Sequence, residues 1–178
     1  ISTMKLLAIA YPLISESDFK LIENFRKEND MLYKVVRPHF TLVFGVDDFS
    51  ADDFIAEIKK QLEDVKSISF CITHALINKD AFTEYYHTFL IPGKGFNEIA
   101  QLNLQLYSDK LKPHHRPDLD YIPHITTGNS TNKMICERMA GEWNEKKVSI
   151  EGIISAVDIV SYDNESVTTL DKIKLNAI

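Results

Sequence analysis

The sequence predicts an α+β protein made by tandem duplication, with two antiparallel sheets flanked by helices around a central cleft. Strand-like and helix-like segments follow in the same order in each half, and a middle strand of each half carries Pro-His-apolar-Thr. The 178 residues are 44% hydrophobic and 26% charged, which is an ordinary globular composition. We therefore expect one bilobal domain over residues 1–178, with lobe-forming halves of approximately 4–80 and 84–178 related by a pseudo-twofold axis.

The first half is expected to run strand, helix, strand, helix, strand. Ser15 or Ser17 can cap the first helix, which ends near Asn29, and Ser50 with Asp53 makes a capping-box-like start to the second. The strands are recognised by apolar, β-branched and aromatic runs. The predicted segments are strands at 4–11, 39–44 and 68–77 and helices at 15–29 and 50–65.

The second half repeats this order and adds one strand. The turns at 78–81 and 92–93 are too short to be flexible linkers, so the two halves should share a core. The predicted segments are strands at 86–91, 122–127, 148–160 and 167–175, helices at 96–107 and 131–143, and a polar loop at 109–121.

Net charge and cysteine content limit the possible partners of the protein and the cellular compartment in which it is expected. A net charge of −6 disfavours a protein that coats long nucleic acid, because such binding relies on many Lys and Arg contacts to phosphates. Cys71 and Cys136 are too few for a disulfide framework and lack metal-site spacing, which indicates buried thiols in a reducing compartment. The first apolar run is too short for a signal peptide, and no run approaches a membrane span. We expect a cytoplasmic monomer that needs no cofactor.

The chemistry is concentrated in two tetrapeptides, Pro38-His39-Phe40-Thr41 and Pro123-His124-Ile125-Thr126. In a strand, residues i and i+2 face the same side about 7 Å apart, so each His should project together with its Thr. The apolar residues between and after them should point into the core. If the two halves bring these faces together, two imidazoles and two hydroxyls converge on one site.

Such a site fits a phosphodiester. An imidazole titrates near neutral pH, so one His can take a proton from the attacking group while the other protonates the leaving oxygen. Thr41 and Thr126 would donate hydrogen bonds to the phosphate as negative charge builds on it. This chemistry needs no metal, and the catalytic candidates are therefore His39, Thr41, His124 and Thr126.

These motifs resemble those of the 2H phosphoesterase superfamily, in particular its bacterial 2′-5′ RNA ligase-like and cyclic phosphodiesterase members. The likeness covers nearly the whole chain, and the family pattern is His, hydrophobic, Thr or Ser, hydrophobic, occurring twice. The first copy fits fully, whereas Thr127 stands where the second copy would carry a hydrophobic residue. The resemblance implies hydrolysis or formation of 2′,3′-cyclic or 2′,5′-linked phosphodiesters, or RNA-end processing. It favours His124 as the base toward water and His39 as the acid.

Residues near the motifs are candidates for binding a small nucleotide or RNA 3′ end. Arg37 directly precedes the first motif, and the basic run before the second contains His115 and Arg116. Tyr121 is a candidate to stack on a base. Each of these residues also has an alternative without a binding role. The charged residues could be solvated loop residues, and the tyrosine could serve ordinary strand packing.

Other functions stay open from sequence alone. The two histidines could be structural residues on strands, or metal ligands, although neither motif has an adjacent acidic residue or a second His at metal-ligand spacing. The same cleft could bind a nucleotide or RNA end without turnover. An RNA 3′-end exonuclease would need a longer basic groove, against which the acidic net charge counts.

Overall fold

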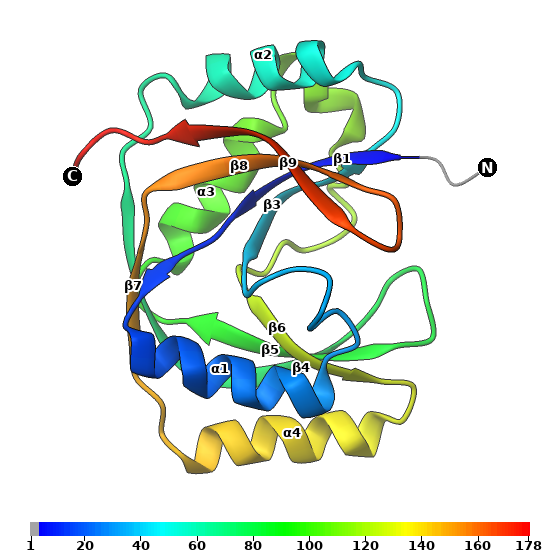
Figure 1. Ribbon diagram of the computed structural model, residues 1–178, viewed down its shortest axis with the longest axis vertical. Coiled ribbons are helices and arrows are strands. Elements are labelled where there is room, and N and C mark those ends of the chain that lie inside the picture. The colour runs from blue at the N-terminus through cyan, green and yellow to red at the C-terminus, as the bar shows by residue number, and fades with distance from the viewer. Residues whose placement is uncertain (1–3) are drawn as a thin grey trace.

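The computed structural model describes residues 4–178 and consists of two antiparallel sheets with helices packed against them (Figure 1). This confirms the predicted α+β class. The four-stranded sheet has the order β3-β1-β8-β9, and the five-stranded sheet has the order β2-β7-β4-β5-β6. A continuous hydrophobic core runs through both.

The four-stranded sheet is covered by α2, at the top of Figure 1, and by α3, which is drawn below α2 at the left. Buried residues of α2 such as Phe54 and Ile58 face it, and Ser50 caps that helix by accepting a hydrogen bond from the Asp53 amide, as predicted. The bounds are β1 (Lys5–Ala10), β3 (Phe40–Val46), β8 (Ala156–Tyr162), β9 (Val167–Lys174), α2 (Ala51–Leu62) and α3 (Phe96–Leu106).

The five-stranded sheet is covered by α1 and α4, at the bottom of Figure 1. Ser15 caps α1 by accepting from the Asp18 amide, and Trp143 of α4 packs against Phe25 of α1 with ring centroids 4.8 Å apart. The bounds are β2 (Leu13–Ile14), β4 (Ile68–Lys79), β5 (Tyr86–Pro92), β6 (Ile125–Ser130), β7 (Ile150–Ile154), α1 (Glu16–Asn29) and α4 (Lys133–Glu145).

The two sequence halves do not each form a lobe, which corrects the expected halves 4–80 and 84–178. Strand β4 of the first half pairs with β5 of the second half, and β8 of the second half pairs with β1 of the first half. Helices cross in the same way, since α1 packs on β6 and α3 packs on β3. The repeat itself is visible, because β3 lies beside β1 as β6 lies beside β5.

Several observed boundaries differ from the predicted ones. The strand expected at 148–160 is interrupted at Ser155, because β7 belongs to the five-stranded sheet and β8 to the four-stranded one. The strand expected at 122–127 begins only at Ile125 and runs to Ser130. The loop expected at 109–121 contains a 3-10 helix, Asp109–His114.

Candidate active site

His39 and His124 occupy equivalent places, each one residue before a strand. β3 begins at Phe40 and β6 at Ile125, so the histidines lie at the entrances of the strands rather than within them, where the sequence pattern had placed them. Both side chains are half-buried. The two segments are close, because the Tyr121 hydroxyl donates to the Thr41 carbonyl at 2.9 Å and His39 influences the pKa of His124.

The two imidazoles are oriented by the same hydrogen bond. Nδ1 of His39 lies 2.8 Å from the Arg37 carbonyl, and Nδ1 of His124 lies 2.6 Å from the Ile122 carbonyl. A carbonyl can only accept, so Nδ1 carries the proton in each ring and Nε2 has a free lone pair in the neutral form. A proline with a fixed φ separates each histidine from its carbonyl. Each Pro-His pair therefore leaves Nε2 as the nitrogen that is free to accept a proton.

Burial sets the ionisation of both rings. It lowers the pKa of His39 and lowers the pKa of His124 to about 4, in each case because a charged imidazolium loses hydration there. The backbone hydrogen bonds oppose this effect, while the neighbouring His39 and His87 lower the pKa of His124 further. Without a ligand, both rings are neutral at pH 7.

The threonines alternate with buried apolar residues as predicted. Thr41 is half-buried while Phe40 and Leu42 on either side are fully buried. In the second copy, Thr126 is half-buried and Ile125 is fully buried. The hydroxyls of Thr41 and Thr126 therefore lie on the less buried face of their strands.

Each motif strand has an irregularity at the residue after the threonine. Between β1 and β3, the pairing passes from Ile9–Thr41 to Ala8–Val43, which leaves Leu42 as an extra residue. Between β5 and β6, it passes from Phe89–Thr126 to Thr88–Gly128, which leaves Thr127. Such β-bulges bend a strand and are common beside functional sites.

The buried threonine at the fourth position of the second motif has a hydrogen-bond partner for its hydroxyl. Thr127 is fully buried, and its hydroxyl donates to the Thr88 carbonyl at 3.4 Å. In the first copy, the Leu42 carbonyl instead accepts from the Asn103 side chain of α3 at 2.8 Å. Both bulges thus have a local polar partner, as buried backbone and hydroxyl groups require.

Aromatic rings pack against both histidines, and neither contact is predicted by the sequence pattern. Phe89 stacks on His124 with ring centroids 3.5 Å apart, and Tyr11 meets His39 edge-on at 6.3 Å. Phe89 is the residue paired with Thr126 in the sheet, so strand pairing would have been needed to find it.

A third histidine extends this stack. His87 lies parallel to Phe89 with centroids 6.1 Å apart, and its Nε2 is 3.0 Å from the Asp80 carboxylate. Within the described chain its Nδ1 is buried without a hydrogen-bond partner. Hydrogen bonds from His87 and from the Phe82 and Thr83 amides lower the pKa of Asp80 despite partial burial. His87 therefore lies beside the site through Phe89.

Two of the predicted binding residues lie beside the motifs. Arg37 is exposed, and its guanidinium lies 4.1 Å from the centre of the Tyr11 ring. Tyr121 is half-buried; its hydroxyl is engaged with Thr41, and its ring meets Phe44 edge-on at 6.4 Å. Burial raises the pKa of Tyr121. Contact with a substrate stays a prediction for both residues.

The other two predicted binding residues belong to the segment after the 3-10 helix. Arg116 makes two hydrogen bonds to Asp118, at 3.0 and 2.8 Å, and lies over the exposed Phe82 ring at 5.5 Å. His115 packs against Tyr107 with centroids 5.7 Å apart. These contacts do not connect either residue to His39 or His124, so substrate binding by His115 and Arg116 also stays a prediction.

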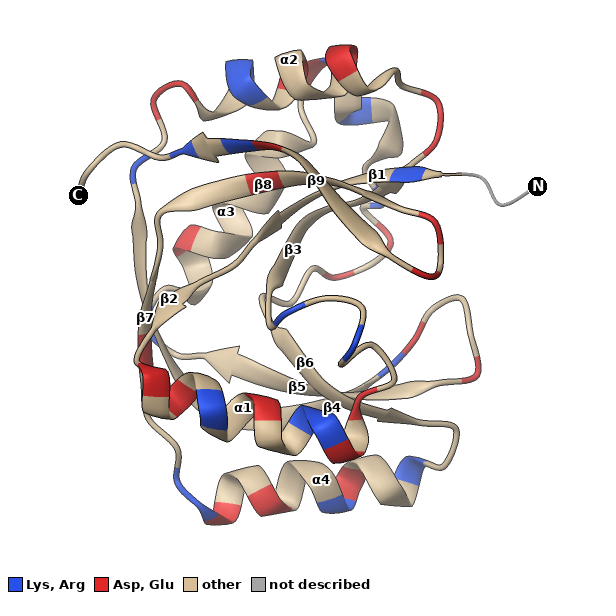
Figure 2. Cartoon of the chain, viewed as in Figure 1, with Lys and Arg blue, Asp and Glu red and all other residues tan. Residues whose placement is uncertain are grey.

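The helices that cover the five-stranded sheet carry charges of both signs. Acidic and basic residues alternate along α1 and α4, and the loop between α1 and β3 carries basic residues (Figure 2).

Among residues 4–178, no three His, Cys, Asp or Glu side chains are grouped so that they could hold a metal ion. No helix in that range is long and apolar enough to cross a membrane. A surface hollow of about 450 Å³ lined by Phe70, Cys71 and Lys94 contains no motif residue.

The fold and the twin histidine motifs define a class of two-sheet proteins with a duplicated His-x-Thr site. A family model described as the 2'-5' RNA ligase superfamily matches residues 14–166. This chain belongs to that superfamily, and the resemblance to 2H phosphoesterases seen in the sequence is confirmed. Among curated proteins, none matches the sequence of this chain.

Solved structures show the same fold. E. coli LigT complexed with 3'-AMP is 14% identical and has a TM-score of 0.60, covering 98% of this chain and 99% of that one. TT0787 of Thermus thermophilus is 10% identical with a TM-score of 0.61, covering 97% and 98%. Usb1 of Kluyveromyces marxianus is 7% identical with a TM-score of 0.53, covering 95% and 98%. At these identities the likeness concerns the fold.

Proposed function

We propose that this protein is a metal-independent phosphodiesterase acting on a 2′,3′-cyclic or 2′,5′-linked phosphodiester of a small nucleotide or RNA end. The observation that carries the proposal is the matched geometry of the two histidines. Both hold a proton on Nδ1 through a backbone carbonyl, so both direct Nε2 away from the backbone. Membership of the 2'-5' RNA ligase superfamily supports the same chemistry.

In hydrolysis of a cyclic phosphate, His124 acts as the base and His39 as the acid. Nε2 of His124 takes a proton from water as the water oxygen bonds to phosphorus. The bond from phosphorus to the 2′ oxygen breaks, and protonated Nε2 of His39 gives its proton to that oxygen. Thr41 and Thr126 donate to the non-bridging oxygens, and the histidines exchange roles in the reverse reaction.

Substrate binding supplies the protonation state that this mechanism needs. Burial keeps both imidazoles neutral at pH 7 without a ligand. A phosphodiester carries one negative charge, and a nearby negative charge favours the imidazolium form. The bound phosphate therefore raises the pKa of the adjacent histidines, so that one of them becomes protonated.

Structures with bound nucleotides exist on this fold. LigT has been solved with 3'-AMP and with ATP, and Usb1 with uridine monophosphate, the latter at a TM-score of 0.51. These ligands belong to those proteins, but they support a nucleotide or RNA end as the ligand class here. Small nucleotides also suit a protein with a net charge of −6, because binding to long nucleic acid relies on many basic contacts.

The test is an assay of purified protein, with EDTA present, on nucleoside 2′,3′-cyclic phosphates and on 2′,5′-linked dinucleotides, with 3′,5′-linked dinucleotides as controls. We expect turnover of at least one of the first two classes and none of the control. Turnover that disappears with chelator would contradict the metal-independent mechanism. Tight nucleotide binding without any product would instead favour a non-catalytic binding module.

A further inference from the structure

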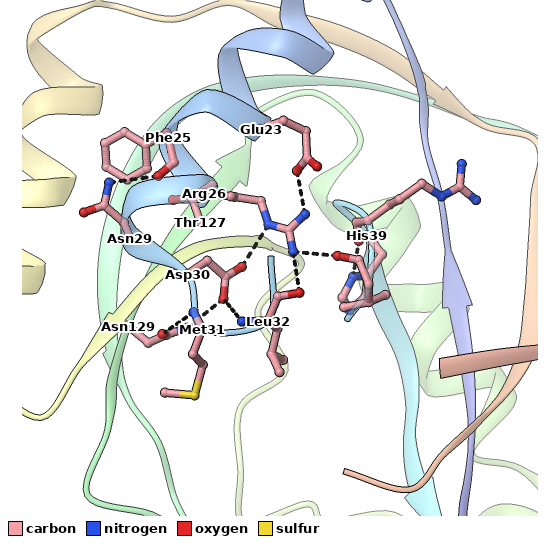
Figure 3. Close-up of polar contacts among 12 residues, drawn as sticks. Glu23, Phe25, Arg26, Asn29, Asp30, Met31, Leu32, His39, Thr127 and Asn129 are labelled. Atoms are coloured by element: carbon pink, nitrogen blue, oxygen red, sulfur yellow. Dashed lines mark hydrogen bonds and ion pairs between the residues drawn. The ribbon is translucent and has the colours of Figure 1, made fainter. Parts of the chain in front are cut away.

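A buried polar network links the segment that carries His39 to the strand that follows His124 (Figure 3). Its centre is Arg26 of α1, which is 1% exposed. The guanidinium Nε donates to the Asp30 carboxylate at 2.9 Å, and Nη1 donates to Glu23 at 2.6 Å. A buried arginine with two carboxylate partners is held in a single geometry.

The same guanidinium holds the segment that leads to the first motif. Nη2 donates to the Leu32 carbonyl at 3.3 Å and to the Val36 carbonyl at 2.6 Å. Val36 is followed directly by Arg37, whose carbonyl accepts the Nδ1 proton of His39. Arg26 thus holds the backbone at Val36, and the next residue, Arg37, supplies the carbonyl that orients the His39 ring.

Asn129 joins this network from the second motif strand. Its Nδ2 donates to Oδ1 of Asp30 at 3.0 Å, and its Oδ1 accepts from the Met31 amide at 3.1 Å. Asn129 lies in β6, three residues after Thr126. One amide side chain thus connects the strand after His124 to the segment before His39 (Figure 3).

We propose that Asn129 is a positioning residue that sets the placement of His39 relative to β6 through Asp30, Arg26 and the Val36–Arg37 backbone. This inference rests on the proposed function only for its kinetic consequence. Reactions that need two groups on one phosphate are sensitive to misplacement, because an error of about 1 Å can lower the rate about 10²-fold. Asp30 raises and Arg26 lowers the pKa of His39, so the ion pair lies within electrostatic reach of the ring.

The variants are Asn129→Ala, which removes both hydrogen bonds, and Asn129→Asp, which keeps the acceptor for Met31 but places a carboxylate against Asp30. Asn144→Ala is the matched control. The Asn144 amide also makes two hydrogen bonds, to the amide and carbonyl of Ala75, but these join α4 to β4 rather than one motif segment to the other. Circular dichroism and thermal unfolding establish that each variant is folded.

The first readout does not need turnover. Imidazole ¹⁵N spectra across pH report the tautomer and titration of His39. We expect the His39 signals and midpoint to shift in both Asn129 variants and to stay at wild-type values in Asn144→Ala. His39 signals that are unchanged in folded Asn129→Ala and Asn129→Asp would overturn the proposal.

The second readout is steady-state kinetics on whichever phosphodiester the wild type turns over. We expect Asn129→Ala to lower kcat between about 10-fold and 10²-fold with little change in KM, and Asn129→Asp to lower it at least as far. Asn144→Ala should keep wild-type kcat. Equal kcat in Asn129→Ala and Asn144→Ala would contradict the positioning role. Altered His39 spectra with no turnover by wild-type protein would contradict the proposed function and leave the positioning role standing.

Discussion

Phe89 lies face to face with His124, with ring centroids 3.5 Å apart and ring planes inclined by 13°. His124 is thus fixed in two ways, in its plane by the Ile122 carbonyl and on its face by Phe89. A ring held in this way loses little freedom when a substrate binds, which is how preorganisation contributes to rate.

Replacing Phe89 with leucine should therefore impair catalysis more than folding. Phe89→Leu keeps an apolar side chain but removes the flat surface on which the imidazole rests. We expect kcat to fall about 10-fold, with a smaller change in KM. Phe70→Leu is the control, since Phe70 is buried in the core, where its ring packs edge-on against Phe40 and not on an imidazole. Equal kcat values for the two variants would show that the stacking has no catalytic role.

The pH dependence of kcat/KM should reflect the lowered pKa values. The mechanism needs one protonated and one neutral imidazole, and burial lowers the pKa of both below 6.5, that of His124 to about 4. As pH rises above 6.5, the singly protonated free enzyme becomes scarce, so kcat/KM should fall. The profile of kcat, which reports the bound state, should lie at higher pH because the phosphate raises these pKa values. A maximum of kcat/KM above pH 7 would contradict this account.

Stability should also depend on His124. Its pKa is lower in the folded than in the unfolded protein, so the unfolded state binds the proton more readily. The stabilisation from the neutral ring is fully present above about pH 6.5 and is lost as pH falls toward 4, by about 1–3 kcal/mol for a shift of this size. Chemical denaturation of wild type and His124→Gln at pH 7 and at pH 4.5 measures it. The wild type should lose more stability than the variant over this interval; an equal loss would contradict the shifted pKa.

Tyr121→Phe separates two roles of one residue. The hydroxyl of Tyr121 donates to the Thr41 carbonyl, linking the approach to the second motif to the first motif strand. If the link positions the site, removing the hydroxyl should lower kcat several-fold and the free energy of unfolding by about 1 kcal/mol. If only the ring matters, through stacking on a base, Tyr121→Phe should keep wild-type kcat and KM. Comparison of the two kinetic constants decides between them.

The alternation of apolar and polar residues was enough to predict most of the fold. The caps at Ser15 and Ser50 and the buried Phe40 and Leu42 follow from local sequence, because capping and strand periodicity are local effects. The pairing of β4 with β5 and of β8 with β1 could not be predicted in the same way. Strands of either half have similar apolar patterns, and nothing local specifies which sheet a strand joins.

The candidate catalytic residues could be named from the sequence, but the residues that pack against them or hold their segments could not. His39, Thr41, His124 and Thr126 stand out because the motif occurs twice. Their supports come from distant residues: Phe89 through strand pairing, and Asn129 and Arg26 through contacts of a helix and a strand with the segment before His39. The extra residue at Leu42 and Thr127 also depends on register, so the sequence indicates only a departure from the motif at Thr127 and not a bulge position.

The central claim is that His39 and His124 act as one acid–base unit, and a double-mutant cycle in the presence of EDTA tests it most directly. His39→Gln, His124→Gln and the double variant would be assayed on the preferred phosphodiester, with His74→Gln, an exposed histidine on β4, as the control. The account predicts that each single variant loses about 10²–10⁴ in kcat, that the double variant is little worse than the poorer single one, and that His74→Gln is unaffected. Wild-type turnover in either single variant, or losses that simply multiply in the double variant, would contradict it.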